Sequence, residues 1–295
     1  MISPSQIRIA ADKIACRAAQ AALAASALVL LASAASAADA KFSIVPAQTY
    51  VERDSVAYKA DIYLPEGKGE HPAVLVVHGG AWFIGNRAHV AWHAESLAAA
   101  GYVAVAINYR LAPRYPFPAQ LEDCQAALCW METNAQKYKI DVKRIGAFGY
   151  SAGGHLVTLL GVLGSDTQLG KCPAKERLRA VVAGGAPCDF CMLPSDNRRL
   201  AYWLGGSRAE EPSAYESASP LRFVTADDPP MCFFHGTRDE LVPQVSPTAM
   251  VAKLKHAGVE TELYTVEGAG HMRAYRDEQA LQASIRFLDR HLKPR

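Results

Sequence analysis

Four short segments of this 295-residue chain are rich in Val, Ile, Ala or Phe and do not alternate between polar and apolar residues. Strands of this kind are buried on both faces, which is typical of parallel sheets covered by helices on each side. The four segments are residues 73–77, 102–107, 144–150 and 180–183. This pattern predicts the centre of a mostly parallel sheet.

Helical patterns separate these strands, and the alternation continues to the end of the chain. Near the start, residues 48–52 and 57–64 flank the turn-prone Arg53-Asp54-Ser55 and predict an antiparallel hairpin. We therefore expect an α/β fold with a mostly parallel sheet, helices on both faces and an antiparallel N-terminal hairpin. The remaining predicted elements are helices at 89–100, 118–138, 152–163, 247–257 and 277–292 and strands at 231–235 and 260–266.

The N-terminal segment has the pattern of a secretory signal. Arg8, Lys13 and Arg17 precede an apolar run, 18–31, that ends in small residues. We expect cleavage after Ala37, with a second choice after Ala40, so that residues 1–37 are removed and 38–295 form one domain in the periplasm or outside the cell. An uncleaved membrane anchor or a packed alanine-rich helix are the alternatives, although the run is shorter than the ~20 residues that a spanning helix needs.

The expected mature chain carries no net charge. Three basic residues and Asp12 lie within residues 1–37, and the whole chain has 31 Lys and Arg against 29 Asp and Glu. A nucleic-acid-binding protein is expected to show a basic excess or stripe. We therefore predict no nucleic-acid partner, and no stable membrane insertion after cleavage; the sequence carries no signal for oligomeric state.

The cysteines favour disulfide or core roles over metal binding. Cys188 and Cys191 form a C-x-x-C pair, but no second pair follows at zinc-ligand spacing. An exported chain can keep a disulfide, which we expect within the group Cys172, Cys188 and Cys191. Cys124 and Cys129 are interpreted as small core residues.

The stretch FGYSAGGH, residues 148–155, places Ser151 between a predicted strand and a predicted helix. This is the context of a nucleophile elbow, whereas the pattern G-x-S-x-G alone would also fit an ordinary turn. Gly149 and Gly153 would let the sharp turn fit beneath neighbouring backbone. A serine hydroxyl needs a base that takes its proton, and the base needs a carboxylate that orients it.

Suitable partners follow Ser151 in the order acid and then histidine. Asp239 comes after strand 231–235, and His271 comes after strand 260–266, each in a glycine-containing loop. Glu240 is the competing acid. We expect His235 to brace the acid loop. We expect His155, one turn into the helix after Ser151, to pack in the core, with a position lining the site as the alternative.

Donors for an oxyanion are predicted at two places. The glycine-rich loop HGGAW, residues 78–82, follows strand 73–77 and offers the backbone NH groups of Gly79, Gly80 and Ala81. The NH of Ala152 at the start of the predicted helix is the other donor. Since the chain supplies nucleophile, base and donors, we predict no metal and no organic cofactor.

The segments HGGAW, NYRLAPRYPFPAQLED, GYSAGGH, HGTRDELVP and GAGH together resemble the α/β-hydrolase superfamily. The likeness is to bacterial carboxylesterases related to hormone-sensitive lipase and to feruloyl and acetyl-xylan esterases, and it covers nearly the whole mature chain. It implies an α/β-hydrolase fold and a serine esterase with nucleophile Ser151, acid Asp239 and base His271. Relatives have a third glycine where this chain has Ala81, so the donors are either Gly79 and Gly80 or Gly80 and Ala81. The resemblance also implies that Asp123 and the turn 110–113 are structural.

The resemblance leads to expectations about the substrate. Hormone-sensitive-lipase relatives carry an N-terminal helical cap, which is missing or minimal here, and residues 188–224 are the candidate for a partial lid. We expect small-molecule or carbohydrate esters with short acyl groups. The aromatic residues expected to bind substrate are Trp82, Tyr150, Phe190, Tyr202 and Trp203.

Two rival functions remain open. A serine peptidase of the prolyl-oligopeptidase type would share the fold and triad, but no propeller-length domain precedes the first strand. A catalytically inactive hydrolase used for binding would not need all three triad residues, which are present here.

Overall fold

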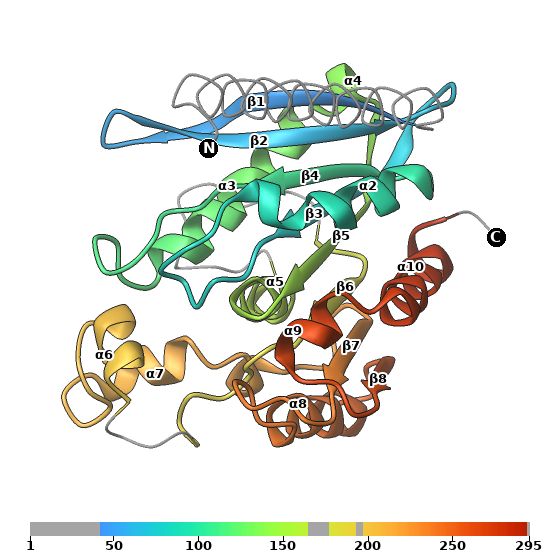
Figure 1. Cartoon of the computed structure of the whole chain (residues 1–295). Helices are drawn as coiled ribbons and strands as arrows, with labels where there is room; N and C mark the ends of the chain where they lie inside the picture. The colour runs from blue at the N-terminus through green and yellow to red at the C-terminus, as the bar shows by residue number, and fades with distance from the viewer. Residues whose placement is uncertain (1–41, 165–176, 193–196, 294–295) are drawn as a thin grey trace, which may run out of the picture. The chain divides into compact units, whose positions relative to one another are not determined.

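A single twisted sheet organises the computed structural model of the chain, which describes residues 42–164, 177–192 and 197–293 (Figure 1). The strand order among these residues is β1-β2-β4-β3-β5-β6-β7-β8. β1 pairs with β2 and β2 with β4 in antiparallel fashion, and every other pair is parallel. The strands are β1 (Phe42–Arg53), β2 (Val56–Pro65), β3 (His71–Val77), β4 (Val103–Ile107), β5 (Ile140–Tyr150), β6 (Val181–Gly184), β7 (Met231–Gly236) and β8 (Thr261–Val266).

The central strands lack polar alternation because both of their faces are covered. Side chains alternate along a strand, so successive residues reach opposite faces. Leu75 and Val77 of β3 belong to one buried hydrophobic cluster, whereas Val74 and Val76 belong to the other. The mostly parallel sheet, its antiparallel N-terminal hairpin and its helical cover are therefore confirmed.

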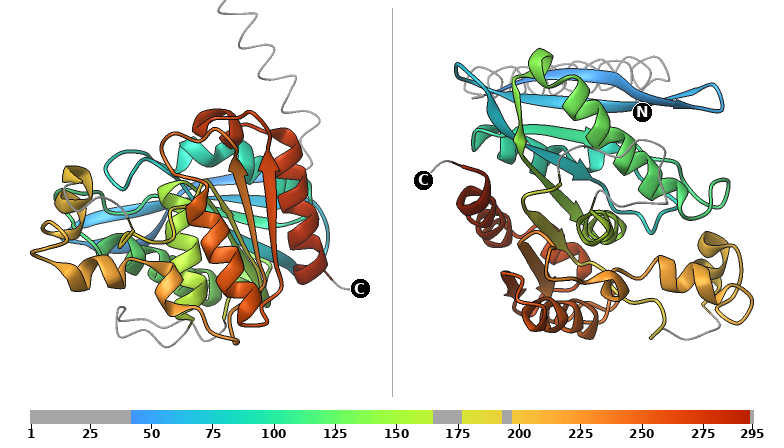
Figure 2. Two further views of the ribbon diagram at one scale, coloured as in Figure 1. Left: turned by 90° about the horizontal axis from the view of Figure 1, so that it is seen from below. Right: turned by 180° about the vertical axis from the view of Figure 1, so that it is seen from behind.

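Helices lie on both faces of the sheet (Figure 2). Residues of α3 (Ala119–Thr133), α5 (Ala152–Leu163) and α8 (Val245–His256) enter the first cluster. Residues of α2 (Ala91–Ala99) and α10 (Glu278–Leu292) enter the second. Shorter elements connect them: α4 (Ala135–Tyr138), α6 (Arg198–Leu204), α7 (Pro212–Ser217), α9 (His271–Tyr275) and the 3₁₀ helices η1 (Arg87–Val90) and η2 (Pro220–Phe223).

Two predicted helices are divided in the structure. The helix expected at 118–138 is interrupted at Asn134, whose side-chain amide donates to the Trp130 carbonyl at 2.9 Å. Asparagine offers the backbone a partner other than the helix, which favours a break at this position. The helix expected at 89–100 begins as η1, where Asn86 caps the NH of Ala88.

Some expectations lie outside the described residues, among them the signal peptide 1–37 and Cys172. Both therefore stay predictions. Within the described ranges, no helix is long and apolar enough to cross a membrane. Cys188 and Cys191 are both free thiols.

A buried ion pair ties the loop after β4 to the start of α3. Asp123 is completely buried and accepts from the backbone NH of Arg110 at 2.8 Å and from its Nε at 3.0 Å. Arg110 also contacts Glu122 at 2.7 Å, but the Glu122 side chain is 37% exposed. The placement agrees with a structural role for Asp123 and for the turn that begins at Arg110.

We predict that Asp123→Ala lowers the free energy of unfolding by about 3–5 kcal/mol, because it leaves the Arg110 guanidinium without its buried partner. Glu122→Ala removes an exposed partner of the same arginine and should cost about 1 kcal/mol or less. Urea unfolding of the two variants provides the measurement. Equal losses would contradict this account of the ion pair.

Candidate active site

Ser151 occupies a sharp turn between β5, which ends at Tyr150, and α5, which begins at Ala152. Its backbone angles of φ 56° and ψ −121° belong to a region that residues with side chains rarely adopt, at a cost of about 1–3 kcal/mol. The Ser151 NH donates to the Gly184 carbonyl of β6 at 2.8 Å. The neighbouring strand therefore holds the serine in its strained conformation.

Glycines make this turn possible. A Cβ atom on Gly153 would lie 2.1 Å from the Val77 carbonyl oxygen, and one on Gly149 would lie 2.3 Å from the Gly153 carbonyl oxygen. Neither position has room for a side chain, as the sequence predicts. The start of α5 is thus pressed against the end of β3, and its first NH groups lie beside Ser151.

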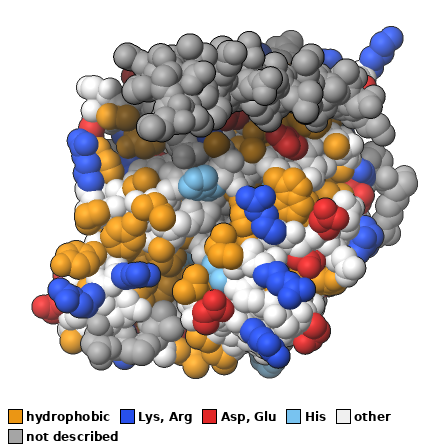
Figure 3. Space-filling view, in the orientation of Figure 1, with side chains coloured by type: hydrophobic (Ala, Val, Ile, Leu, Met, Phe, Trp, Pro, Cys, Tyr) orange, Lys and Arg blue, Asp and Glu red, His pale blue; other side chains and the backbone are white. Residues whose placement is uncertain are grey.

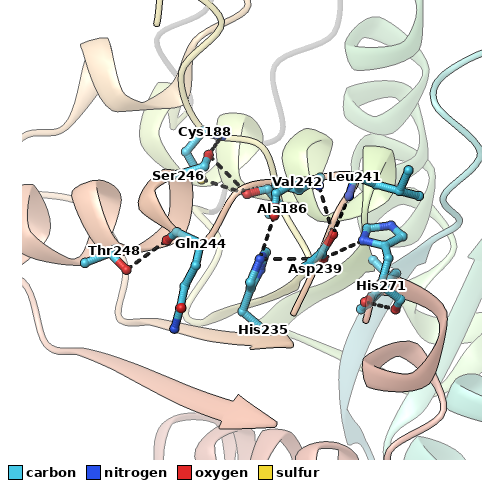
Figure 4. Close-up of polar contacts among 11 residues, drawn as sticks. Ala186, Cys188, His235, Asp239, Leu241, Val242, Gln244, Ser246, Thr248 and His271 are labelled. Atoms are coloured by element: carbon cyan, nitrogen blue, oxygen red, sulfur yellow. Dashed lines mark hydrogen bonds and ion pairs between the residues drawn. The ribbon is translucent and has the colours of Figure 1, made fainter. Parts of the chain in front are cut away.

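Asp239 and His271 form a short hydrogen bond at the ends of two neighbouring strands (Figure 4). Asp239 Oδ2 lies 2.6 Å from His271 Nδ1. Asp239 Oδ1 accepts from the backbone NH groups of Leu241 and Val242, each at 2.9 Å. The carboxylate that contacts the imidazole is therefore that of Asp239, whereas Glu240 lies beside Gly270.

This environment keeps Asp239 ionised and sets the histidine tautomer. Burial would raise the pKa of Asp239, but the hydrogen bonds from His271 and from the backbone hold it below its ordinary value. An ionised carboxylate only accepts hydrogen bonds, so His271 Nδ1 carries the proton. In the neutral ring this tautomer leaves the lone pair on Nε2, as a general base requires.

His235 lies on the other side of the Asp239 carboxylate from His271 (Figure 4). Its Nε2 donates to the Val242 carbonyl at 2.9 Å and lies 3.5 Å from Asp239 Oδ2. Burial lowers the pKa of His235, against the attraction of Asp239, so the ring is neutral at neutral pH. Its position agrees with the expected bracing of the acid loop.

Tyr150 contacts His271 through a hydrogen bond and through ring packing. Its hydroxyl donates to the His271 carbonyl at 2.5 Å, and the two rings lie 5.0 Å apart. A Cβ atom on Gly185 would lie 2.9 Å from Tyr150 Cζ and 3.0 Å from His271 Cε1. Tyr150 is 3% exposed, so the ring expected to stack on substrate packs against the histidine instead.

The loop after β3 passes directly over Ser151. A Cβ atom on Gly79 would lie 3.1 Å from Ser151 Cβ and 2.9 Å from the Tyr150 carbonyl oxygen, so glycine allows this close approach. The structure thus brings Gly79 and Ala152 to the serine from two sides. Which of the Gly79, Gly80 and Ala81 NH groups donate to an oxyanion stays a prediction.

The other aromatic candidates divide between core and surface. Trp82, Phe190 and Trp203 pack against one another and are 7%, 1% and 0% exposed. Tyr202 is 61% exposed on α6 and can meet a ligand as it stands. Sequence patterns could not separate these cases, because contacts between distant segments decide the burial of each ring.

Six large hydrophobic side chains of the described residues are exposed outside β1 and β2. Figure 3 shows hydrophobic side chains gathered on the face that carries α6 and α9 in Figure 1. Elsewhere in the described chain, Ile44 and Val56 are the other exposed large hydrophobics. The six residues are Ile84, Met192, Tyr202, Leu241, Val245 and Met272. In the described ranges, no three His, Cys, Asp or Glu residues are placed to hold a metal ion.

Comparison with known proteins agrees with this geometry. Residues 60–254 match the family described as BD-FAE. The chain belongs to the BD-FAE family. Its fold is accordingly that of the α/β-hydrolases, as the sequence motifs indicate.

Relatives of this BD-FAE chain include esterases. It is 33% identical over 208 residues to "Probable carboxylic ester hydrolase LipM" of Mycobacterium tuberculosis, covering 66% of this chain and 48% of LipM, so it spans about half the length of that curated relative. The solved "Truncated form of carbohydrate esterase from gut microbiota" is 28% identical, with a TM-score of 0.79 over 87% of this chain and 99% of that one. Thermogutta terrifontis esterase 2 with butyrate bound is 26% identical, with a TM-score of 0.71 over 86% and 96% of the two chains.

We predict that Asp239→Asn lowers kcat for a nitrophenyl ester by about 10³- to 10⁴-fold, because the amide favours the wrong tautomer of His271 and no longer stabilises its charged form. Steady-state kinetics and a thermal melt on the purified variant provide the measurement. Glu240→Gln is the matched control and should retain kcat within about threefold. A folded Asp239→Asn enzyme with near wild-type kcat would exclude Asp239 as the acid.

Proposed function

We propose that this BD-FAE chain is a secreted serine esterase that hydrolyses short-acyl carboxylic esters through a covalent acyl-enzyme. Ser151 is the nucleophile, His271 the general base and Asp239 the acid that orients it. The hydrogen bond of 2.6 Å between Asp239 and His271 carries the proposal, because it leaves Nε2 free for the serine in the strained turn. The predicted signal segment supports export.

The first half of the reaction forms the acyl-enzyme. Ser151 Oγ attacks the ester carbonyl carbon while His271 Nε2 takes its proton. The carbonyl π electrons move to oxygen, and backbone NH groups stabilise the resulting oxyanion. The intermediate collapses, the bond to the alcohol oxygen breaks, and His271 returns the proton to the departing alcohol.

The second half repeats these steps with water. His271 takes a proton from water, whose oxygen attacks the acyl carbon, and the Ser151 Oγ leaves with the proton from His271. The products are a carboxylic acid and free enzyme. Asp239 stays ionised throughout and stabilises the imidazolium in both halves.

Three observations support the substrate class. Short-chain acids are bound in a solved relative, and a carbohydrate esterase is among the structural neighbours. In this chain Trp82, Phe190 and Trp203 pack against one another and are buried, so these three rings offer little exposed apolar surface to a long acyl tail. We therefore assign short acyl groups and a small or carbohydrate alcohol.

A fluorophosphonate probe tests the proposal directly. Wild-type protein should be labelled on the peptide that contains Ser151 and should hydrolyse nitrophenyl butyrate, whereas Ser151→Ala should do neither and melt within about 3 °C of wild type. Absence of labelling in the wild type would favour an inactive binding protein. Faster cleavage of peptides than of esters would favour the peptidase alternative.

We also predict that kcat/KM peaks between acetate and about butyrate in a series of nitrophenyl esters. Burial of each additional CH₂ would contribute ~0.8 kcal/mol, but only if a longer chain found apolar surroundings. The series from acetate to decanoate provides the measurement. A steady rise to decanoate would overturn the short-acyl assignment.

A further inference from the structure

Three separate segments of the chain pack their rings around the buried His155 of α5. Trp82 comes from the loop after β3, Phe190 from the segment after β6, and Trp203 from α6. Trp82 and Trp203 are stacked with centroids 3.7 Å apart and planes 6° apart. The centroid of the His155 ring lies 5.3, 5.1 and 5.4 Å from the ring centroids of Trp82, Phe190 and Trp203, each in an edge-to-face arrangement.

Both ring nitrogens of His155 have partners. Trp82 Nε1 can only donate, so His155 Nδ1, 3.3 Å away, accepts. Nε2 then carries the proton and donates to the Ala218 carbonyl at 2.7 Å. Burial lowers the pKa of His155 to about 4, so this neutral tautomer is the form present at neutral pH. The ring thus links the loop after β3 to the segment between α7 and η2.

The loop that Trp82 belongs to needs such an anchor. Gly80, Ala81 and Trp82 have successive φ values of 120°, 51° and 67°. Glycine adopts positive φ freely, but alanine and tryptophan do so only when contacts hold them there. The Trp82 carbonyl accepts from the NH of Ala112 at 3.0 Å, and its indole is held by the His155 hydrogen bond and the Trp203 stack.

We propose that His155 is a positioning residue for the oxyanion hole, acting through Trp82 on the loop that contains Gly79, Gly80 and Ala81. The inference rests on the proposed function, since it assigns that loop to oxyanion binding. It also gives the segment that carries Trp203 and Ala218 a new role. This segment, interpreted from sequence as a partial lid, contacts Trp82 through Trp203 and His155 through Ala218.

The first variant removes the hydrogen bonds and retains a ring. His155→Phe keeps aromatic contacts but leaves Trp82 Nε1 and the Ala218 carbonyl without partners. Misplaced donors weaken transition-state binding more than substrate binding, so kcat should fall about 10- to 100-fold while KM changes less than about threefold. The affinity for a trifluoromethyl ketone that mimics the tetrahedral intermediate should fall by the same factor as kcat/KM.

The second variant replaces the donor of the hydrogen bond between Trp82 and His155. Trp82→Phe keeps an aromatic ring but removes the donor and part of the indole, and it should show a similar loss of kcat while KM changes less than about threefold. Both variants remove the hydrogen bond between Trp82 and His155, so the double variant should lose less kcat than the product of the two single losses. Phe117→Leu is the control: Phe117 packs against Trp203 at 5.5 Å, and its truncation should change kcat less than about threefold.

The outcomes separate this inference from the proposed function. If the fluorophosphonate probe does not label Ser151 in the wild-type protein, the proposed function is refuted, and the role of His155 with it. Wild-type labelling together with normal kcat in folded Trp82→Phe and His155→Phe would overturn the positioning role alone. Equal losses in these variants and in Phe117→Leu would likewise assign His155 to core packing.

Discussion

The fit of α5 between two strand ends is the constraint on which the rest of the site depends. The Val77 carbonyl of β3 and the Gly184 carbonyl of β6 flank the start of this helix so closely that only glycine fits at positions 153 and 154. β5 lies between β3 and β6 in the sheet, so its last residue meets the helix in a turn with no room to relax. The surrounding sheet holds Ser151 in its strained conformation at the carboxyl ends of the strands.

One histidine of the site differs from the other buried histidines in its electrostatic environment. Burial lowers the pKa of His78 and of His155 to about 4 and also lowers that of His235, so these rings are neutral hydrogen-bonding groups at neutral pH. His271 differs because its Nδ1 lies 2.6 Å from a carboxylate that backbone NH groups hold in its ionised form. His271 is therefore the imidazole to which the proposed mechanism assigns proton transfer, whereas His155 and His235 hold neighbouring segments through hydrogen bonds to backbone carbonyls.

The sequence predicted those parts of the fold that depend on local pattern. Unbroken apolar runs indicated buried parallel strands, and the glycines around Ser151 indicated a turn with close backbone contacts. The sequence also predicted that Asp239 and His271 lie near each other, because each follows one of two consecutive strands and parallel strands end at one edge of the sheet.

Patterns could not predict contacts between distant segments. The burial of Trp203 under Trp82, the hydrogen bond from Tyr150 to His271 and the two partners of His155 join residues 63 to 121 positions apart. Four of the five rings expected to bind substrate, those of Trp82, Tyr150, Phe190 and Trp203, are buried for this reason. The break at Asn134 depends on a side chain that can either continue the helix or end it.

The central claim is that an ester's acyl group is transferred to Ser151 before water releases it. Rapid mixing with nitrophenyl butyrate, an acid quench and peptide mass spectrometry would measure this intermediate directly. The account predicts a butyryl group on the peptide that contains Ser151, appearing within the first turnover and disappearing as substrate is consumed. Steady turnover without acylation of that peptide in any sample, or with the acyl group on another residue, would contradict it.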